Sequence, residues 1–166
     1  MKCFTILQPW ASLLFSGAKR FETRSWLTNH RGLLAIHAGR KFPEAARALC
    51  QTEPFRLALR EAGFRDSADL PRGVVLGYVE LVGCYPTEDL TAHRIVPVNS
   101  AEWVFGDYRP GRWAWGCRWP VRLAILFPFP GWRGLFDVPD QLLRRPLLPR
   151  CPAGCGSTCP NAPLRG

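Results

Sequence analysis

Proline and glycine interrupt this chain so often that only short helices and strands fit between them. The sequence holds 16 prolines and 15 glycines in 166 residues. Pro9 and Gly17 bracket one helical segment, because proline is favoured in the first turn of a helix and glycine after the last. The longest strand pattern, GVVLGYVELVGC at residues 73–84, is rich in β-branched residues. The spacing predicts an α+β domain whose short strands close into a small β-barrel with flanking helices.

The other strands and helices are predicted from the same kinds of pattern. Further strands are expected at residues 2–7, 20–26 and 33–38, at 113–119 and, separately, at 121–128, and helical pieces after Pro43 and over residues 55–63. From residue 144 the chain is rich in Pro, Gly and Arg and has no periodicity. This break predicts one domain over residues 1–143 and a disordered tail over residues 144–166.

The formal net charge of +9 favours anionic partners such as nucleic acids, nucleotides or membrane surfaces. Arginine outnumbers lysine by 19 to 3, however, which a GC-rich genome also produces. The apolar segment after Lys2 is split by Gln8 and Pro9, so it does not have the unbroken core of a signal peptide. No run approaches the length of a membrane span. A cytoplasmic protein without a membrane partner is therefore expected.

Seven cysteines, an odd number without clear pairing, argue against a disulfide scaffold. The first four lie in apolar surroundings and are expected to be buried thiols. Cys151, Cys155 and Cys159 show metal-like spacing, but a fourth ligand and a nearby histidine are missing from the sequence. We expect no metal site and no cofactor.

The segment GAKRFETRSW, residues 17–26, places unusual charge on a predicted strand. On a strand, Glu22 and Arg24 share one side, whereas Thr23 points to the other. Lys19 lies in the preceding turn, from which its long side chain can reach the same surface. The three charges would then lie together, and replacing Lys19 or Arg24 by alanine would cost no more than about 1 kcal/mol. A surface ion-pair cluster is the alternative.

An ordered series of motifs resembles the ASCH domain, the activating signal cointegrator homology domain. They are QPWASLLFSGAK followed by Glu22, Arg24 and Trp26, then TNHRGLLAIHAG, GVVLGYVELVGC, GDYRPGRWAW and GWRGLF, over about residues 1–140. The resemblance implies a PUA-like barrel with a cleft beside the first helix, and it implies binding of RNA or a nucleotide. The ligand-binding residues expected in a basic cleft are Gln8, Trp10, Lys19, Glu22, Arg24, Arg31, His37 and Trp115.

Each of these residues has a reason and an alternative. Trp10 could stack on a base or pack in the core. Arg31 lies in a turn from which it could reach phosphate, and His37 ends a strand, where a structural role is common. Trp115 alternates with arginine along a strand, as in base-binding surfaces, but tryptophans that cover a barrel end have the same pattern.

Two other functions stay open. One branch of small bacterial ASCH proteins is similar to amidohydrolases that act on N4-acylated cytidines, and it matches the lysine and the arginine of the motif. That branch has a threonine at the position of Glu22, so a hydrolase here would need Lys19 as base or nucleophile with Glu22 as its partner. The other function is a scaffold for protein contacts. Binding of RNA or a nucleotide ranks above both.

Overall fold

The computed structural model describes residues 1–143, and its six strands form one mixed sheet. The strands are β1 (Lys2–Ile6), β2 (Phe21–Arg24), β3 (Gly32–Ala38), β4 (Val74–Pro86), β5 (Trp113–Pro128) and β6 (Phe136–Asp137). Their order across the sheet is β2-β5-β4-β3-β1-β6. β1 and β3 pair in parallel, and every other pair is antiparallel. The predicted α+β class is confirmed.

The helices are short, as the proline and glycine spacing predicts. They are α1 (Trp10–Ser16), α2 (Glu44–Leu49), α3 (Phe55–Glu61), α4 (Thr87–Ala92), α5 (Ala101–Val104) and α6 (Asp140–Leu143), with a 3₁₀ turn over Ser67–Asp69. Gly17 ends α1 with a positive φ of 81° and donates its N–H to the Leu14 carbonyl, which closes the helix C-terminus. The segment over residues 85–104, which carried little sequence signal, contains α4 and α5.

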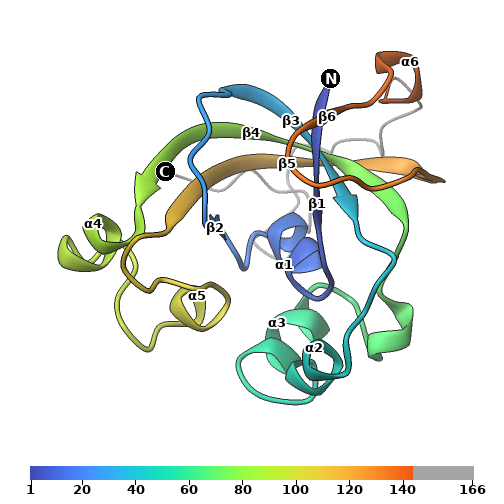
Figure 1. The fold of residues 1–166 in the computed structure, drawn as a ribbon. Helices are drawn as coiled ribbons and strands as arrows, with labels where there is room; N and C mark the ends of the chain where they lie inside the picture. The colour runs from blue at the N-terminus through green and yellow to red at the C-terminus, as the bar shows by residue number, and fades with distance from the viewer. Residues whose placement is uncertain (144–166) are drawn as a thin grey trace, which may run out of the picture.

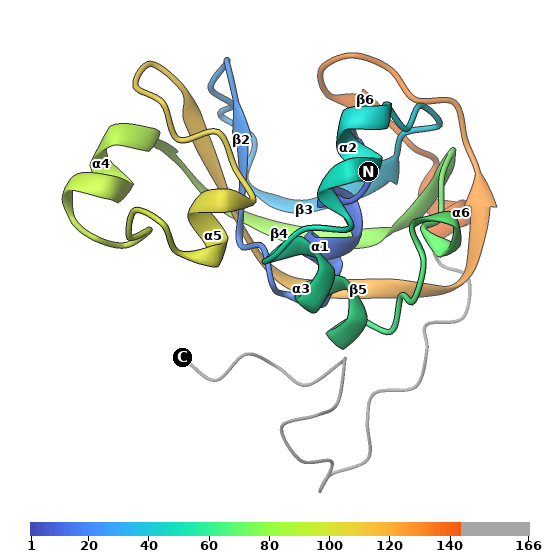
Figure 2. The same ribbon diagram turned by 90° about the horizontal axis from the view of Figure 1, so that it is seen from below.

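The sheet is strongly curved and arches over α1 (Figure 1). Leu14 and Phe15 of α1 pack with Leu34, Ile36 and Trp115 of the sheet in the largest core cluster. A second cluster joins α1 to α2 and α3 through residues that include Leu13, Phe42 and Phe55. In the view from below, α5 lies to one side of α1, α3 lies next to α1, and α4 lies far from α2 (Figure 2). α2, α3 and α5 are therefore near the N-terminal helix, beside which the family resemblance implied a cleft.

A side chain links the two sides of the curved sheet. Arg24 of β2 donates from Nη2 to the Thr5 carbonyl of β1 at 2.7 Å. Its guanidinium also lies 5.3 Å from the Phe4 ring centroid. β1 and β2 are separated by three strands in the ladder, so this contact draws the sheet around α1 in the manner of a small barrel.

The prediction of two strands around residue 120 is wrong, because β5 continues through all 16 residues. Trp119 has a positive φ of 48°, and the β4–β5 pairing shifts register at three places, so the strand bends without ending. At Gly77 of β4 a Cβ atom would lie 2.0 Å from the Val121 carbonyl oxygen. Only glycine allows this close approach of the two bent strands. The predicted break between the strands over residues 113–119 and 121–128 is a bulge in one continuous strand.

Within residues 1–143 every helix is too short or too polar to cross a lipid bilayer.

Candidate functional site

A pocket of about 250 Å³ opens between α1, β2, α5 and the ends of α2 and α3. Its lining comprises Trp10, Lys19, Glu22, Thr23, Leu49, Phe55, Val104, Phe105, Gly106 and Asp107. Three of these residues are aromatic and three carry charge. The volume is below the range typical of drug-sized ligands. A pocket of this size, lined by both aromatic rings and polar groups, suits a small planar ligand that can form hydrogen bonds.

Lys19 forms the polar floor of the pocket and is only 1% exposed. Because α1 ends at Gly17, the chain turns back and the Lys19 N–H donates to the Leu13 carbonyl at 3.1 Å. The Lys19 ammonium donates to the Phe21 carbonyl. Its Nζ also lies 3.5 Å from Glu22 Oε2. The ammonium therefore donates one hydrogen bond within the protein, to Phe21, and has an ion-pair partner in Glu22.

Glu22 is the carboxylate that remains available to a ligand. Its side chain is 9% exposed, and Oε1 lies 3.6 Å from Arg24 Nε. Among residues 1–143 no hydrogen bond reaches this carboxylate, although two cations lie near it. Neither carboxylate oxygen is among the fully enclosed atoms that lack a hydrogen bond, so both remain accessible to a ligand. Glu22 thus offers free acceptor positions inside the pocket.

Glu102 of α5 is a second buried carboxylate, which no sequence pattern had marked. Its Oε2 accepts from the Arg20 N–H at 2.7 Å, and Oε1 accepts from the Phe21 N–H at 3.2 Å and the Tyr108 hydroxyl at 3.1 Å. Burial, with the adjacent Glu102 charge, raises the pKa of Tyr108 far above its usual range. Glu102 therefore holds the start of β2, and with it Lys19, in place.

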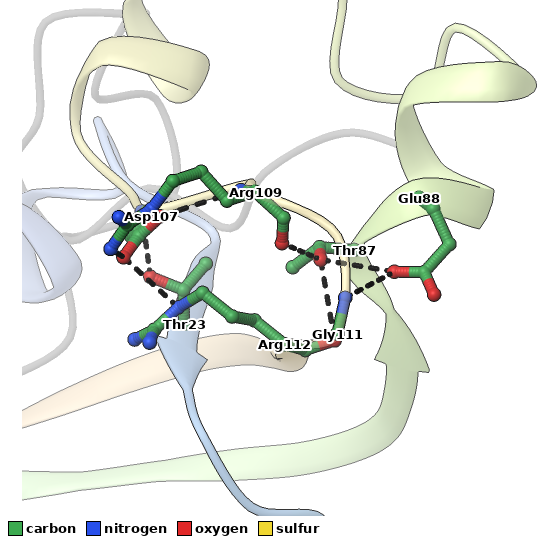
Figure 3. Close-up of polar contacts among 7 residues, drawn as sticks. All are labelled: Thr23, Thr87, Glu88, Asp107, Arg109, Gly111 and Arg112. Atoms are coloured by element: carbon green, nitrogen blue, oxygen red, sulfur yellow. Dashed lines mark hydrogen bonds and ion pairs between the residues drawn. The ribbon is translucent and has the colours of Figure 1, made fainter.

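Asp107 lies on the pocket wall, in the loop between α5 and β5 (Figure 3). Its N–H donates to Thr23 Oγ1 at 2.9 Å. Arg109 donates to both carboxylate oxygens at 2.7 and 2.8 Å, and Arg112 Nε lies 3.2 Å from Oδ2. These hydrogen bonds lower the pKa of Asp107. Its oxygens are occupied, so Asp107 stabilises the loop rather than offering an acceptor.

The same loop is fixed from its other side by Thr87 (Figure 3). Thr87 Oγ1 donates to the Arg109 carbonyl at 2.8 Å, which ties the loop to the start of α4. Thr23 lines the pocket as well, although strand alternation places it opposite Glu22, because this loop folds over the edge strand β2. The loop residues were not recognised from sequence, since they contact β2 across about 80 positions.

The charge of the pocket differs from that of the whole chain. Its lining carries one ammonium, Lys19, and two carboxylates, Glu22 and Asp107. Arg24 lies behind Glu22 and bonds to β1, so it is not part of the lining. The formal charge of +9 is therefore located elsewhere on the molecule. This pocket suits a neutral, hydrogen-bonding group better than a phosphate.

Of the other residues proposed from the sequence, Trp10 lies at the pocket and four lie away from it. Trp10 contacts Phe55 edge to face, with ring centroids 6.3 Å apart. Gln8 is buried and accepts from the Ser12 N–H through Oε1 while Nε2 donates to the Pro71 carbonyl, so it fixes the start of α1. His37 pairs with Thr5 Oγ1 through Nδ1, and burial lowers its pKa.

Arg31 and Trp115 also lie away from the pocket. Arg31 donates to the carbonyls of Thr28 and His30 in its own turn. Trp115 has no exposed surface and donates from Nε1 to the Trp26 carbonyl, so it packs in the core and cannot stack on a ligand there. The alternation of side chains along a strand could not distinguish core packing from base stacking for Trp115. The difference depends on which face of β5 the helix α1 covers.

Among residues 1–143 no three His, Cys, Asp or Glu side chains lie together as metal ligands would. Cys151, Cys155 and Cys159, and the tail predicted over residues 144–166, lie outside the described residues.

The curved sheet around a short N-terminal helix, with a pocket beside that helix, defines a PUA-like domain. Residues 4–113 match the family model described as ASCH domain. Activating signal cointegrator 1 from Homo sapiens is 34% identical over 131 residues, which cover 78% of this chain. The protein of the same name from Mus musculus matches to the same extent. The chain therefore belongs to the ASCH domain family, as the motifs indicated.

The matched region is a small part of those relatives, since the chain spans 21% of their length. Among solved structures, a single-residue mutant of the ZmASCH protein from Zymomonas mobilis superposes with a TM-score of 0.50. The match covers 84% of this chain and 91% of that chain at 13% sequence identity. At that identity the likeness concerns the fold alone.

Proposed function

We propose that this ASCH domain binds RNA or a nucleotide and that its pocket receives a single nucleobase. The observation that carries this proposal is Glu22, a buried carboxylate without a hydrogen bond among the described residues, at a pocket lined by aromatic rings. A base edge supplies N–H donors that such a carboxylate accepts. The family membership supports the same ligand class.

The pocket offers a complementary pair of groups to a base edge. Glu22 accepts, and Lys19 has N–H groups left after its hydrogen bond to the Phe21 carbonyl. A base edge that carries a donor beside an acceptor satisfies both groups at once. Trp10 is half-buried on the wall, where stacking on a base contributes about 1–3 kcal/mol. The ligand enters as a base because the pocket lining has no free cation to hold a phosphate.

The test is to titrate the protein with a panel of nucleosides and short RNAs. Tryptophan fluorescence and calorimetry measure the binding. Glu22→Gln should weaken nucleoside binding at least about 10-fold, because a hydrogen bond to a charged acceptor is lost. Glu61→Gln is the matched control, since it makes the same change at an exposed carboxylate at the end of α3, which forms no ion pair or side-chain hydrogen bond within residues 1–143. Equal affinity of the wild type and Glu22→Gln for every nucleoside would contradict the proposal.

Hydrolysis of an N4-acylated cytidine is a second candidate, which the closeness of Lys19 and Glu22 in the pocket favours. It ranks lower, because both contacts of the Lys19 side chain stabilise an ammonium, whereas a base or nucleophile must be the free amine. The same panel decides between them. A wild-type protein that binds the acylated cytidine but releases no acid supports the binding role.

A further inference from the structure

Two arginines share one phenylalanine ring at the start of α2. The Arg47 guanidinium lies 5.4 Å from the Phe42 ring centroid, and the Arg72 guanidinium lies 5.8 Å from the same centroid. Phe42 is itself buried against Leu13, Phe55 and other residues of the helical core. The ring is therefore a fixed contact that two positively charged side chains share.

A third arginine lies beside this pair. A Cβ atom on Gly73 would be 3.5 Å from Arg40 Nε, so the Arg40 side chain passes over the residue that follows Arg72. Arg40, Arg47 and Arg72 form what we call the Phe42 arginine cluster. All three are exposed, and within residues 1–143 none of them forms an ion pair or a side-chain hydrogen bond.

Like charges held together without a counter-ion repel one another. Elsewhere on this protein, Arg109 and Arg112 have a carboxylate between them, Asp107. In the described part of the chain no carboxylate lies within 4.0 Å of the nitrogens of the Phe42 arginine cluster, although Glu44 is on the same helix as Arg47. An external anion would remove the repulsion, and the planar guanidinium fork is suited to phosphate oxygens.

An exposed aromatic side chain lies on a loop that is joined to the cluster segment. The Phe129 N–H donates to the Gly73 carbonyl at 3.1 Å, so the loop after β5 contacts the segment that carries Arg72. On that loop the Trp132 ring contacts Phe129 at 5.9 Å between centroids and is 52% exposed. Cations and an exposed tryptophan on connected segments fit single-stranded nucleic acid, in which phosphates alternate with bases that can stack.

We propose that the Phe42 arginine cluster binds the phosphodiester backbone of single-stranded RNA. This site is separate from the pocket and goes beyond the single base proposed for it. The helix α2 connects the two, since its last residue, Leu49, lines the pocket and Arg47 belongs to the cluster. The ligand is then a strand rather than a free nucleoside. An acidic peptide would meet the charges but would not use Trp132 as a stacking surface.

The experiment measures the affinity for a fluorescein-labelled single-stranded RNA at several salt concentrations, with the full chain. Arg47→Gln combined with Arg72→Gln should make the slope of log affinity against log salt less negative by about 1.4, because each phosphate contact on a single strand contributes about 0.7. Arg47→Lys with Arg72→Lys keeps the charges and should keep most of that slope. Nucleoside binding in the pocket should be unchanged in both.

Arg94→Gln is the matched control, because this exposed arginine follows α4, far from α2 in both views (Figures 1 and 2). A slope that changes equally in the control and in the cluster variants would overturn the proposal. So would RNA binding that is absent from the wild type while nucleosides still bind, a result that leaves the pocket proposal standing. Equal affinity and equal salt dependence for a poly-glutamate peptide would assign the cluster to a protein partner instead.

Discussion

At the scale of single residues, the charged segment is built into the protein and is not a solvated surface cluster. Lys19 is 1% exposed and Glu22 is 7% exposed, so both charges are buried and stabilise one another. The expectation that an alanine at position 19 would cost no more than about 1 kcal/mol assumed an exposed side chain. Removing one partner of a buried pair leaves an uncompensated charge, which is much more costly.

Lys19→Met should therefore lower the free energy of unfolding by about 3 kcal/mol, measured by urea denaturation. Glu22→Gln should also destabilise the protein. In the double variant Lys19→Met/Glu22→Gln the loss should be at least about 1 kcal/mol smaller than the sum of the two single losses, because neither charge is then left alone. Additive losses, or a loss below about 1 kcal/mol for Lys19→Met, would show that the two side chains do not depend on one another.

At the scale of elements, the short helix α5 positions the edge strand β2. It has only four residues, with Ser100 Oγ accepting the Trp103 N–H at its N-terminus. Glu102 on this helix accepts the first two N–H groups of the β2 segment. β2 pairs with β5 on one side only, so these contacts replace part of a missing strand neighbour. The geometry of the pocket floor therefore depends on a helix that is distant in sequence.

Glu102→Gln should destabilise the protein by about 2 kcal/mol, because the amide nitrogen cannot accept one of the hydrogen bonds that the carboxylate receives. Hydrogen exchange at the Phe21 amide should become faster, and nucleoside binding should weaken because Lys19 loses its fixed position. Glu61→Gln, an exposed change at the end of α3, should stay within about 0.5 kcal/mol of the wild type. Unchanged exchange at Phe21 in Glu102→Gln would exclude this positioning role.

Local patterns predicted the elements better than the contacts between them. Pro9 and Gly17 marked α1, and the spacing of Lys19, Glu22 and Trp10 identified one side of the pocket. Glu102 and Asp107 escaped notice, because a carboxylate in a segment of low signal gives no indication of the strand that it will contact some 80 residues away. The role of Trp115 was ambiguous, because the alternation of tryptophan and arginine along the strand does not show which of these side chains are buried.

At the scale of the whole molecule, the core clusters of the described chain extend from its first strand to Leu143. The third cluster joins β1, β3 and β4 to the end of the described chain through Cys3, Val75, Val138 and Leu143. Met1 closes the same region, since its N-terminal amine lies 2.6 Å from Asp140 Oδ1. We therefore propose that residues 1–143 form a domain that folds without residues 144–166.

A chain that stops after Leu143 should unfold in one cooperative transition, with a melting temperature within about 2 °C of the full chain. Differential scanning calorimetry of both proteins provides the comparison. Nucleoside binding should also be retained, because every residue of the pocket lies before position 143. Loss of the cooperative transition would show that the residues after Leu143 belong to the folding unit.

The place of β1 in the sheet has a consequence for synthesis on the ribosome. β1 emerges first, yet its neighbours are β3 and the two-residue strand β6 near position 136. Its antiparallel edge therefore stays unpaired until almost all of the domain has left the exit tunnel. An unpaired strand edge attracts other chains, and contacts of such long sequence separation form slowly. During most of the synthesis of residues 1–143, one edge of β1 is therefore open to pairing with other chains.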